Sequence, residues 1–127
     1  MKLRQVEPVI FAENWPKLID WYIQVLGFKT STRVETDYHY CVLKHLGGAD
    51  LGIADAKEMS VSIKDRSSNS VLLQFQVPDV KDFLTRVSEQ GGSTTFGPSY
   101  EKDEQIWFGG FSDLEGNPFW VVDENCP

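Results

Sequence analysis

The side chains able to support metal binding or acid–base chemistry are few, and most lie in the first half of the chain. His39 and His45 lie an even number of positions apart in an apolar stretch with strand character, so alternation places both on one face. Glu35 and Asp37 lie close by in the sequence. These types of side chain can ligate a divalent metal, so one hypothesis is an unorthodox metal cluster on this strand. The simpler interpretation is a pair of exposed strand histidines.

Two further residues have the right type for catalysis. Cys41 follows His39 on the same strand face. The two residues could form a nucleophilic cysteine–histidine pair, or they could simply be neighbours on an alternating strand without a catalytic role. Glu7 would act as a base or a counter-ion if it projected into an aromatic cavity, and otherwise it is an exposed glutamate near the start. The sequence has no Walker A loop, GxGxxG, GxSxG or HExxH motif, so no common catalytic signature accompanies these residues.

Length and charge narrow the classes of function. The chain has 127 residues, 41% of them hydrophobic, which predicts a single domain over residues 1–127 with a core of its own. A net charge of −7 disfavours nucleic acid and anionic membrane surfaces as partners. No apolar run has the length of a membrane span and no secretory signal is evident, so we expect a cytoplasmic protein. The two cysteines, Cys41 and Cys126, are expected to be free thiols.

An internal repeat organises the chain. In the first half, Asn14 is placed to cap a helix that Gly27 ends. In the second half, Asp79 caps and Gly91-Gly92 ends a helix with the same apolar stripe. At one constant offset, the matching pairs are Asn14 and Asp79, Leu18 and Phe83, Ile19 and Leu84, Tyr22 and Val87, and Gly27 and Gly92.

Strand-like segments surround each helix. The expected strands are residues 4–11, 28–35, 38–46 and 51–54 in the first half and 71–77, 93–96, 105–111 and 118–122 in the second. Each half therefore has the order strand, helix and three strands. We predict a first βαβββ module over residues 1–56, a linker or mobile flap over residues 57–69, and a second βαβββ module over residues 70–127.

This arrangement resembles the vicinal oxygen chelate superfamily, which comprises glyoxalases, bleomycin-resistance proteins and dioxygenases. Residues 21–28, WYIQVLGF, are similar to the end of that family's first helix, and residues 111–120, FSDLEGNPFW, are similar to its last hairpin. Leu114 stands where the family usually has proline. The resemblance implies an α+β fold of two repeated βαβββ modules, which form a curved mixed sheet around a concave cavity with the helices outside.

Metal-dependent members of this family supply one metal ligand from each of four strands. The resemblance places those positions on Glu7, Gly52, Leu72 and Trp120. Only Glu7 has a side chain that binds a divalent metal, and a shift of one residue at any position restores no site. We therefore expect no metal cofactor at these positions, which is the pattern of the family's metal-free, bleomycin-resistance-like branch.

With its metal ligands replaced, the concave face is expected to be aromatic and apolar with a few polar anchors, which suits a small organic ligand. The expected ligand-binding residues are Glu7, Val9, Phe11, Tyr38, Tyr40, Leu72, Gln74, Gln76, Trp107 and Trp120. The negative charge favours a ligand that is cationic as well as aromatic.

Three classes of function follow. The first is a metal-independent protein that binds an antibiotic or a toxic metabolite, without catalysis. The second is a lyase, isomerase or ring-cleaving dioxygenase of the same superfamily with a displaced site around Glu7, His39 or His45. The third is a regulatory or interaction module without a small ligand. The resemblance also implies a homodimer whose cavities are completed across the subunit interface.

Overall fold

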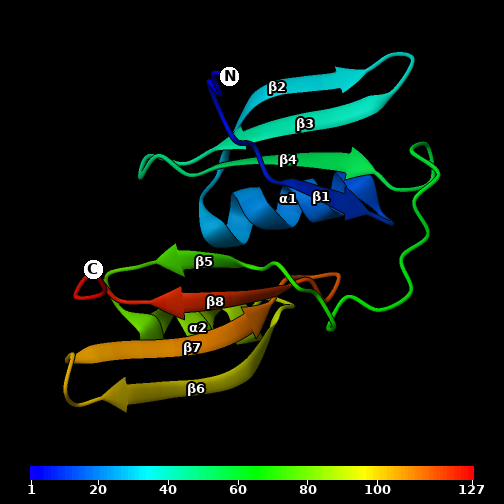
Figure 1. Cartoon of the computed structure of the whole chain (residues 1–127). Coiled ribbons are helices and arrows are strands. Elements are labelled where there is room, and N and C mark those ends of the chain that lie inside the picture. Colours follow the sequence, from blue (N-terminus) through cyan, green and yellow to red (C-terminus); the bar gives the residue numbers. More distant parts are fainter. The chain divides into compact units, whose positions relative to one another are not determined.

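A computed structural model describes residues 1–127, which divide into two compact units, residues 1–63 and 64–127 (Figure 1). Each unit contains four strands and one helix in the order β, α, β, β, β. The predicted α+β fold of two βαβββ modules is confirmed, and the strands form two separate four-stranded sheets, one in each unit.

The first unit is built on a mixed sheet with the strand order β1-β4-β3-β2. The elements are β1 (Val9–Ala12), α1 (Trp15–Leu26), β2 (Lys29–Glu35), β3 (His39–Lys44) and β4 (Asp50–Asp55). β1 is parallel to β4, and the other neighbours are antiparallel. Helix α1 packs on one face of this sheet, where Ile53, Leu43 and Cys41 are fully buried.

The second unit repeats this topology with the strand order β5-β8-β7-β6. Its elements are β5 (Leu73–Gln76), α2 (Val80–Glu89), β6 (Ser93–Glu101), β7 (Ile106–Ser112) and β8 (Pro118–Val122). β5 is parallel to β8, and α2 packs on one face of the sheet. Phe111, Phe119 and Val121 form the core beneath this helix.

Both helices begin at the residues that the sequence indicates. The Asn14 side chain accepts a hydrogen bond from the backbone N–H of Lys17, and Asp79 accepts one from the N–H of Asp82. α1 ends at Gly27, whose φ of 80° is the left-handed conformation that glycine adopts without strain. Neither helix is long and apolar enough to cross a membrane.

Most strand boundaries differ from the prediction by one or two residues, and two differ by more. β1 begins at Val9 rather than at residue 4, because Pro8 lacks the N–H that would continue the ladder. β6 continues through Gly97 and Pro98 to Glu101 instead of ending at residue 96. This is possible because β6 lies at the edge of its sheet and its register shifts between Phe96 and Ser99, so the proline falls in an irregularity.

The segment predicted as a linker, residues 57–69, contains the boundary between the two units. Its later part is attached to the second unit by Arg66, whose guanidinium donates hydrogen bonds to Glu115 and Asn117 in the turn between β7 and β8. The Arg66–Glu115 ion pair is 2.7 Å long and nearly buried.

Candidate functional site

The first sheet has one face opposite α1, which we call its helix-free face. Directly paired residues share a face of a sheet, so the register identifies the members of this one. Two rows cross it, Val9–Gly52–Val42–Thr32 and Phe11–Ala54–Tyr40–Val34. Val9, Phe11 and Tyr40, all expected to bind ligand, thus lie on one face.

Glu7 reaches this helix-free face through a hydrogen bond. The Tyr40 hydroxyl donates to the Glu7 carboxylate at 2.8 Å. The Tyr40 ring extends over Gly52, which lies two residues before its paired residue Ala54 on β4. There is room for the ring because Gly52 has no side chain: a Cβ on Gly52 would come within 2.0 Å of the Tyr40 oxygen. Gly52 therefore makes room for the phenol that holds Glu7 in place.

The environment of Tyr40 raises the pKa of its hydroxyl to about 12. Burial is the largest cause, and the hydrogen bond to Glu7 and the negative charge of Glu7 add to it. Tyr40 therefore stays a hydrogen-bond donor throughout the physiological pH range.

We expect the Tyr40 hydroxyl to ionise well above the ordinary tyrosine pKa of about 10 in an alkaline titration. Because the folded protein disfavours the phenolate, this contribution to stability is complete below the unfolded pKa of about 10 and is lost as the pH rises toward 12. In Glu7→Gln, the pKa of Tyr40 should fall part of the way toward 10, since the charge disappears while burial remains. Phenolate absorbance, read as the difference from Tyr40→Phe, measures this; an unchanged pKa in Glu7→Gln would show that the contact does not form.

The second sheet has a corresponding helix-free face, opposite α2. One row of residues crosses all four of its strands: Gln74, Trp120, Gly110 and Phe96. Trp120 is 50% exposed and Phe96 is 41% exposed. Their rings meet edge to face with centroids 6.4 Å apart, and Phe96 lies over Gly110, where a Cβ would come within 2.3 Å of the ring. Two large aromatic side chains thus stand accessible beside the amide of Gln74.

Three further expected residues lie near these faces. Leu72 directly precedes β5 and is half-buried. Gln76 shares the face of Gln74, and its amide donates a hydrogen bond to the carbonyl of Cys126. Tyr38 lies exposed in the turn between β2 and β3.

Trp107 does not join the aromatic group of Trp120. It lies on the opposite face of the second sheet, beside α2, where the Lys81 ammonium stands 3.9 Å from the centroid of its ring. β7 is apolar at almost every position, so its alternation does not indicate which side chains face the helix. The structure places Phe96, which the sequence analysis missed, next to Trp120 instead. Only the register of β6 against β7 brings this about, and no local signal marks it.

The histidines share a face, as alternation indicates, but it is the α1 face rather than the helix-free one. His39 contacts the Glu58 carboxylate through its ring and its backbone N–H, and the ring packs edge-on against Trp15. His45 contacts the carbonyl of Leu26 through Nε2. Both histidines are engaged in structural contacts; the side chain of His39 is 38% exposed, and His45 is partly buried. Glu7 and Tyr40 lie on the other face of the same sheet.

Cys41 is buried beneath α1, and burial raises the pKa of its thiol. The thiolate is the reactive form of cysteine, so this environment opposes a cysteine–histidine nucleophile. Both cysteines are free thiols.

The four family ligand positions do not form a metal-binding set of side chains. In the first unit, Glu7 is hydrogen-bonded to Tyr40 and Gly52 has no side chain. In the second unit, Leu72 and Trp120 offer no side-chain oxygen or imidazole nitrogen. No three histidine, cysteine, aspartate or glutamate side chains gather in a group able to hold a metal ion.

The chain has two βαβββ units, each with a helix on one face of a mixed sheet. The helix-free face of each sheet carries aromatic and polar side chains. This architecture defines the class of protein. The family model of the Glyoxalase/Bleomycin resistance protein/Dioxygenase superfamily matches residues 4–121, and the chain belongs to this superfamily. Comparison with curated proteins finds no match.

Solved structures with the same fold include proteins from several bacteria. The hypothetical protein SA1046 from S. aureus has a TM-score of 0.77 at 17% identity, covering 97% of this chain and 95% of that one. A superfamily member from Sphaerobacter thermophilus has a TM-score of 0.77 at 18% identity, covering 96% and 98%. TnmS3, an antibiotic binding protein from Streptomyces sp. CB03234, has a TM-score of 0.72 at 19% identity, covering 97% and 98%.

Proposed function

We propose that this protein binds a small aromatic organic molecule, such as an antibiotic or a toxic metabolite, without a metal and without transforming it. The observation that carries the proposal is the row of accessible side chains on the helix-free face of the second sheet, Gln74, Trp120 and Phe96. An exposed tryptophan and phenylalanine offer a large flat surface for stacking, and an amide beside them fixes the orientation of a ligand.

The chemistry of the side chains supports binding without a metal. Three of the four family ligand positions, Gly52, Leu72 and Trp120, have no donor for a divalent cation, and the fourth, Glu7, is held by Tyr40. A catalytic zinc site typically has three protein ligands in fixed geometry. On the first sheet, the carboxylate of Glu7 suits a cationic group, in keeping with the net charge of −7.

The fold relationship also supports the binding proposal. TnmS3 has this fold and is an antibiotic binding protein. The same architecture therefore serves binding in at least one relative, and the aromatic row assigns a surface for it in this chain. A homodimer remains a prediction of the family resemblance, and sedimentation analysis would test it.

The test is a binding assay with the flat cationic dye proflavine and the anionic dye anilinonaphthalene sulfonate. The protein is first freed of metal with a chelator, and binding is then monitored by tryptophan fluorescence. We expect saturable binding of an aromatic compound, with Trp120→Ala weakening it by about tenfold or more, because a stacked aromatic contact and its buried area are worth about 1–3 kcal/mol. The matched control is Tyr100→Ala, which removes a 46%-exposed aromatic side chain from the opposite face of the same sheet and should leave the affinity unchanged.

Metal analysis of the purified protein distinguishes the alternative. Stoichiometric zinc, nickel, manganese or iron that is lost in Glu7→Ala would contradict the proposal and would favour a lyase, isomerase or dioxygenase. Equal binding by wild type and Trp120→Ala would exclude the aromatic row as the binding surface.

A further inference from the structure

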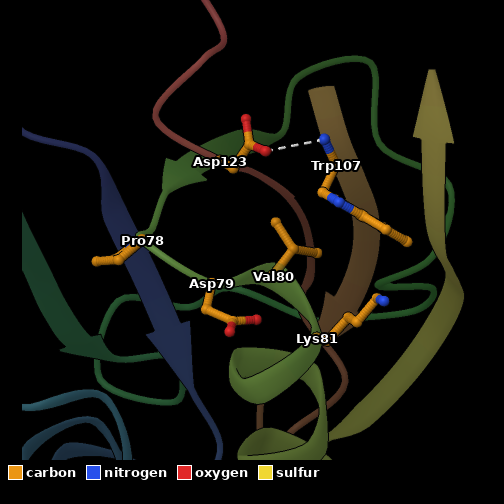
Figure 2. Close-up of a pocket in the computed structure, with 6 residues that line it drawn as sticks. All are labelled: Pro78, Asp79, Val80, Lys81, Trp107 and Asp123. Atoms are coloured by element: carbon orange, nitrogen blue, oxygen red, sulfur yellow. Dashed lines mark hydrogen bonds between the residues drawn. The ribbon is translucent and has the colours of Figure 1, made fainter. Parts of the chain in front are cut away.

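A separate cavity of about 240 Å³ lies on the helix side of the second unit (Figure 2). It is bounded by the segment that leads into α2, the start of β7 and the residue that follows β8. The lining residues are Pro78, Asp79, Val80, Lys81, Trp107 and Asp123. This cavity does not include the helix-free face, so it is distinct from the surface proposed above. Its volume is below the roughly 300–1,000 Å³ of sites for drug-sized molecules, which limits it to small ligands.

One side of the cavity carries a positive charge on an aromatic surface. The Lys81 ammonium stands over the Trp107 indole, 3.9 Å from the ring centroid, and both lie together in Figure 2. A cation–π contact holds an ammonium in place but leaves its N–H donors available for an anionic group. Lys81 can therefore receive a ligand carboxylate while Trp107 covers the ligand's apolar part.

Two carboxylates complete the cavity. Asp123 is only 8% exposed, and its two oxygens accept hydrogen bonds from the backbone N–H groups of Trp107 and Asn125, each at 3.0 Å. Asp79 is held as the N-cap of α2 by the N–H of Asp82. An ionised carboxylate has about four acceptor sites, so each aspartate retains capacity for a ligand ammonium. Such charge-assisted hydrogen bonds are short and strong.

We propose that this cavity binds a small zwitterion of the α-amino acid type. The ligand ammonium pairs with Asp79, the ligand carboxylate pairs with Lys81, and the side chain rests against Trp107, Val80 and Pro78, with the Asp123 carboxylate on the facing wall of the cavity. A singly charged ligand would leave either the carboxylates or Lys81 without its partner. The fixed aspartates and the apolar walls thus favour a molecule that carries both charges close together.

The experiment follows the indole N–H signal of Trp107 by nuclear magnetic resonance, with Trp107→Phe identifying the signal. L-alanine and L-leucine should shift it saturably. Propionate and propylamine, which carry one charge each, should bind with an affinity at least about tenfold lower, because each lacks one charge-assisted contact. No saturable shift with either amino acid, or equal affinity for the singly charged compounds, would overturn the proposal.

Two variants test the assigned contacts. Lys81→Met keeps an unbranched side chain over Trp107 without the charge, and Asp79→Ser keeps a helix cap without the carboxylate. Each should weaken amino acid binding by about tenfold, as expected for the loss of one charged partner. Lys102→Met, an exposed lysine in the turn between β6 and β7, is the matched control and should bind like the wild type. Wild-type affinity in Lys81→Met would also overturn the proposal.

Discussion

Phe111→Ala is expected to lower the free energy of unfolding by about 3–5 kcal/mol, the range for truncating a buried phenylalanine. Phe111 is fully buried in β7 and stacks on Phe119, with centroids 5.0 Å apart and planes 10° from parallel. Phe83 of α2 and Phe75 of β5 pack against the same ring. Alanine would leave a cavity at the point where helix and sheet meet.

Urea denaturation of Phe111→Ala and Phe96→Ala measures this effect against a matched control. Phe96 belongs to the same sheet but lies on the helix-free face and is substantially exposed, so its loss should cost about 1 kcal/mol or less. If Phe111→Ala does not fold, Phe111→Leu should fold with a smaller loss of stability. Equal destabilisation by Phe96→Ala and Phe111→Ala would contradict the division into a structural face and an accessible face.

Asp113→Ala is expected to destabilise the protein by about 3–5 kcal/mol. Asp113 is 2% exposed and anchors the turn between β7 and β8. Its Oδ1 accepts hydrogen bonds from the backbone N–H groups of Glu115 and Asn117, and its Oδ2 accepts one from the Asn117 side chain. Removal of the carboxylate leaves three donors without their partner, at a cost of about 1–3 kcal/mol for each buried group.

Asp113→Asn separates the contributions of the two oxygens. The amide keeps an acceptor at Oδ1 for the two backbone donors but places an N–H₂ group against that of Asn117, so an intermediate loss of stability is expected. In thermal unfolding monitored by circular dichroism, we expect the melting temperature to decrease in the order wild type, Asp113→Asn, Asp113→Ala. A loss below about 1 kcal/mol in Asp113→Ala would mean that the turn does not depend on this carboxylate.

The helix-covered faces of the sheets form the core of each unit, whereas the helix-free faces carry the side chains available for binding. The residues beneath the helices are apolar and tightly packed, and the histidines that suggested a metal cluster serve this side of the first sheet. The helix-free faces retain accessible aromatic and polar side chains, which are the groups available to a ligand. Chemistry based on Cys41 would need access through the packed layer beneath α1.

The amino-acid sequence by itself determined the repeated plan of the protein. Asn14 and Asp79 cap the two helices as predicted, because a capping side chain acts on backbone groups only a few residues away. Gly27 ends α1 for an equally local reason, since its conformation is one that glycine adopts without strain. The placement of Val9 and Phe11 on one face followed from alternation along their strand.

Only the tertiary structure decided which residues meet across strands. Trp107 and Trp120 were both expected to bind ligand, yet β7 places Trp107 beside α2 and β8 places Trp120 next to Phe96. The contact of Tyr40 with Glu7 depends on Gly52 of a neighbouring strand, and the cavity at Lys81 gathers segments that lie far apart in the chain. Such contacts depend on strand register, and a shift of one residue reverses the face of every side chain. Local patterns specify caps and turns, whereas register is settled by the packing of the whole unit.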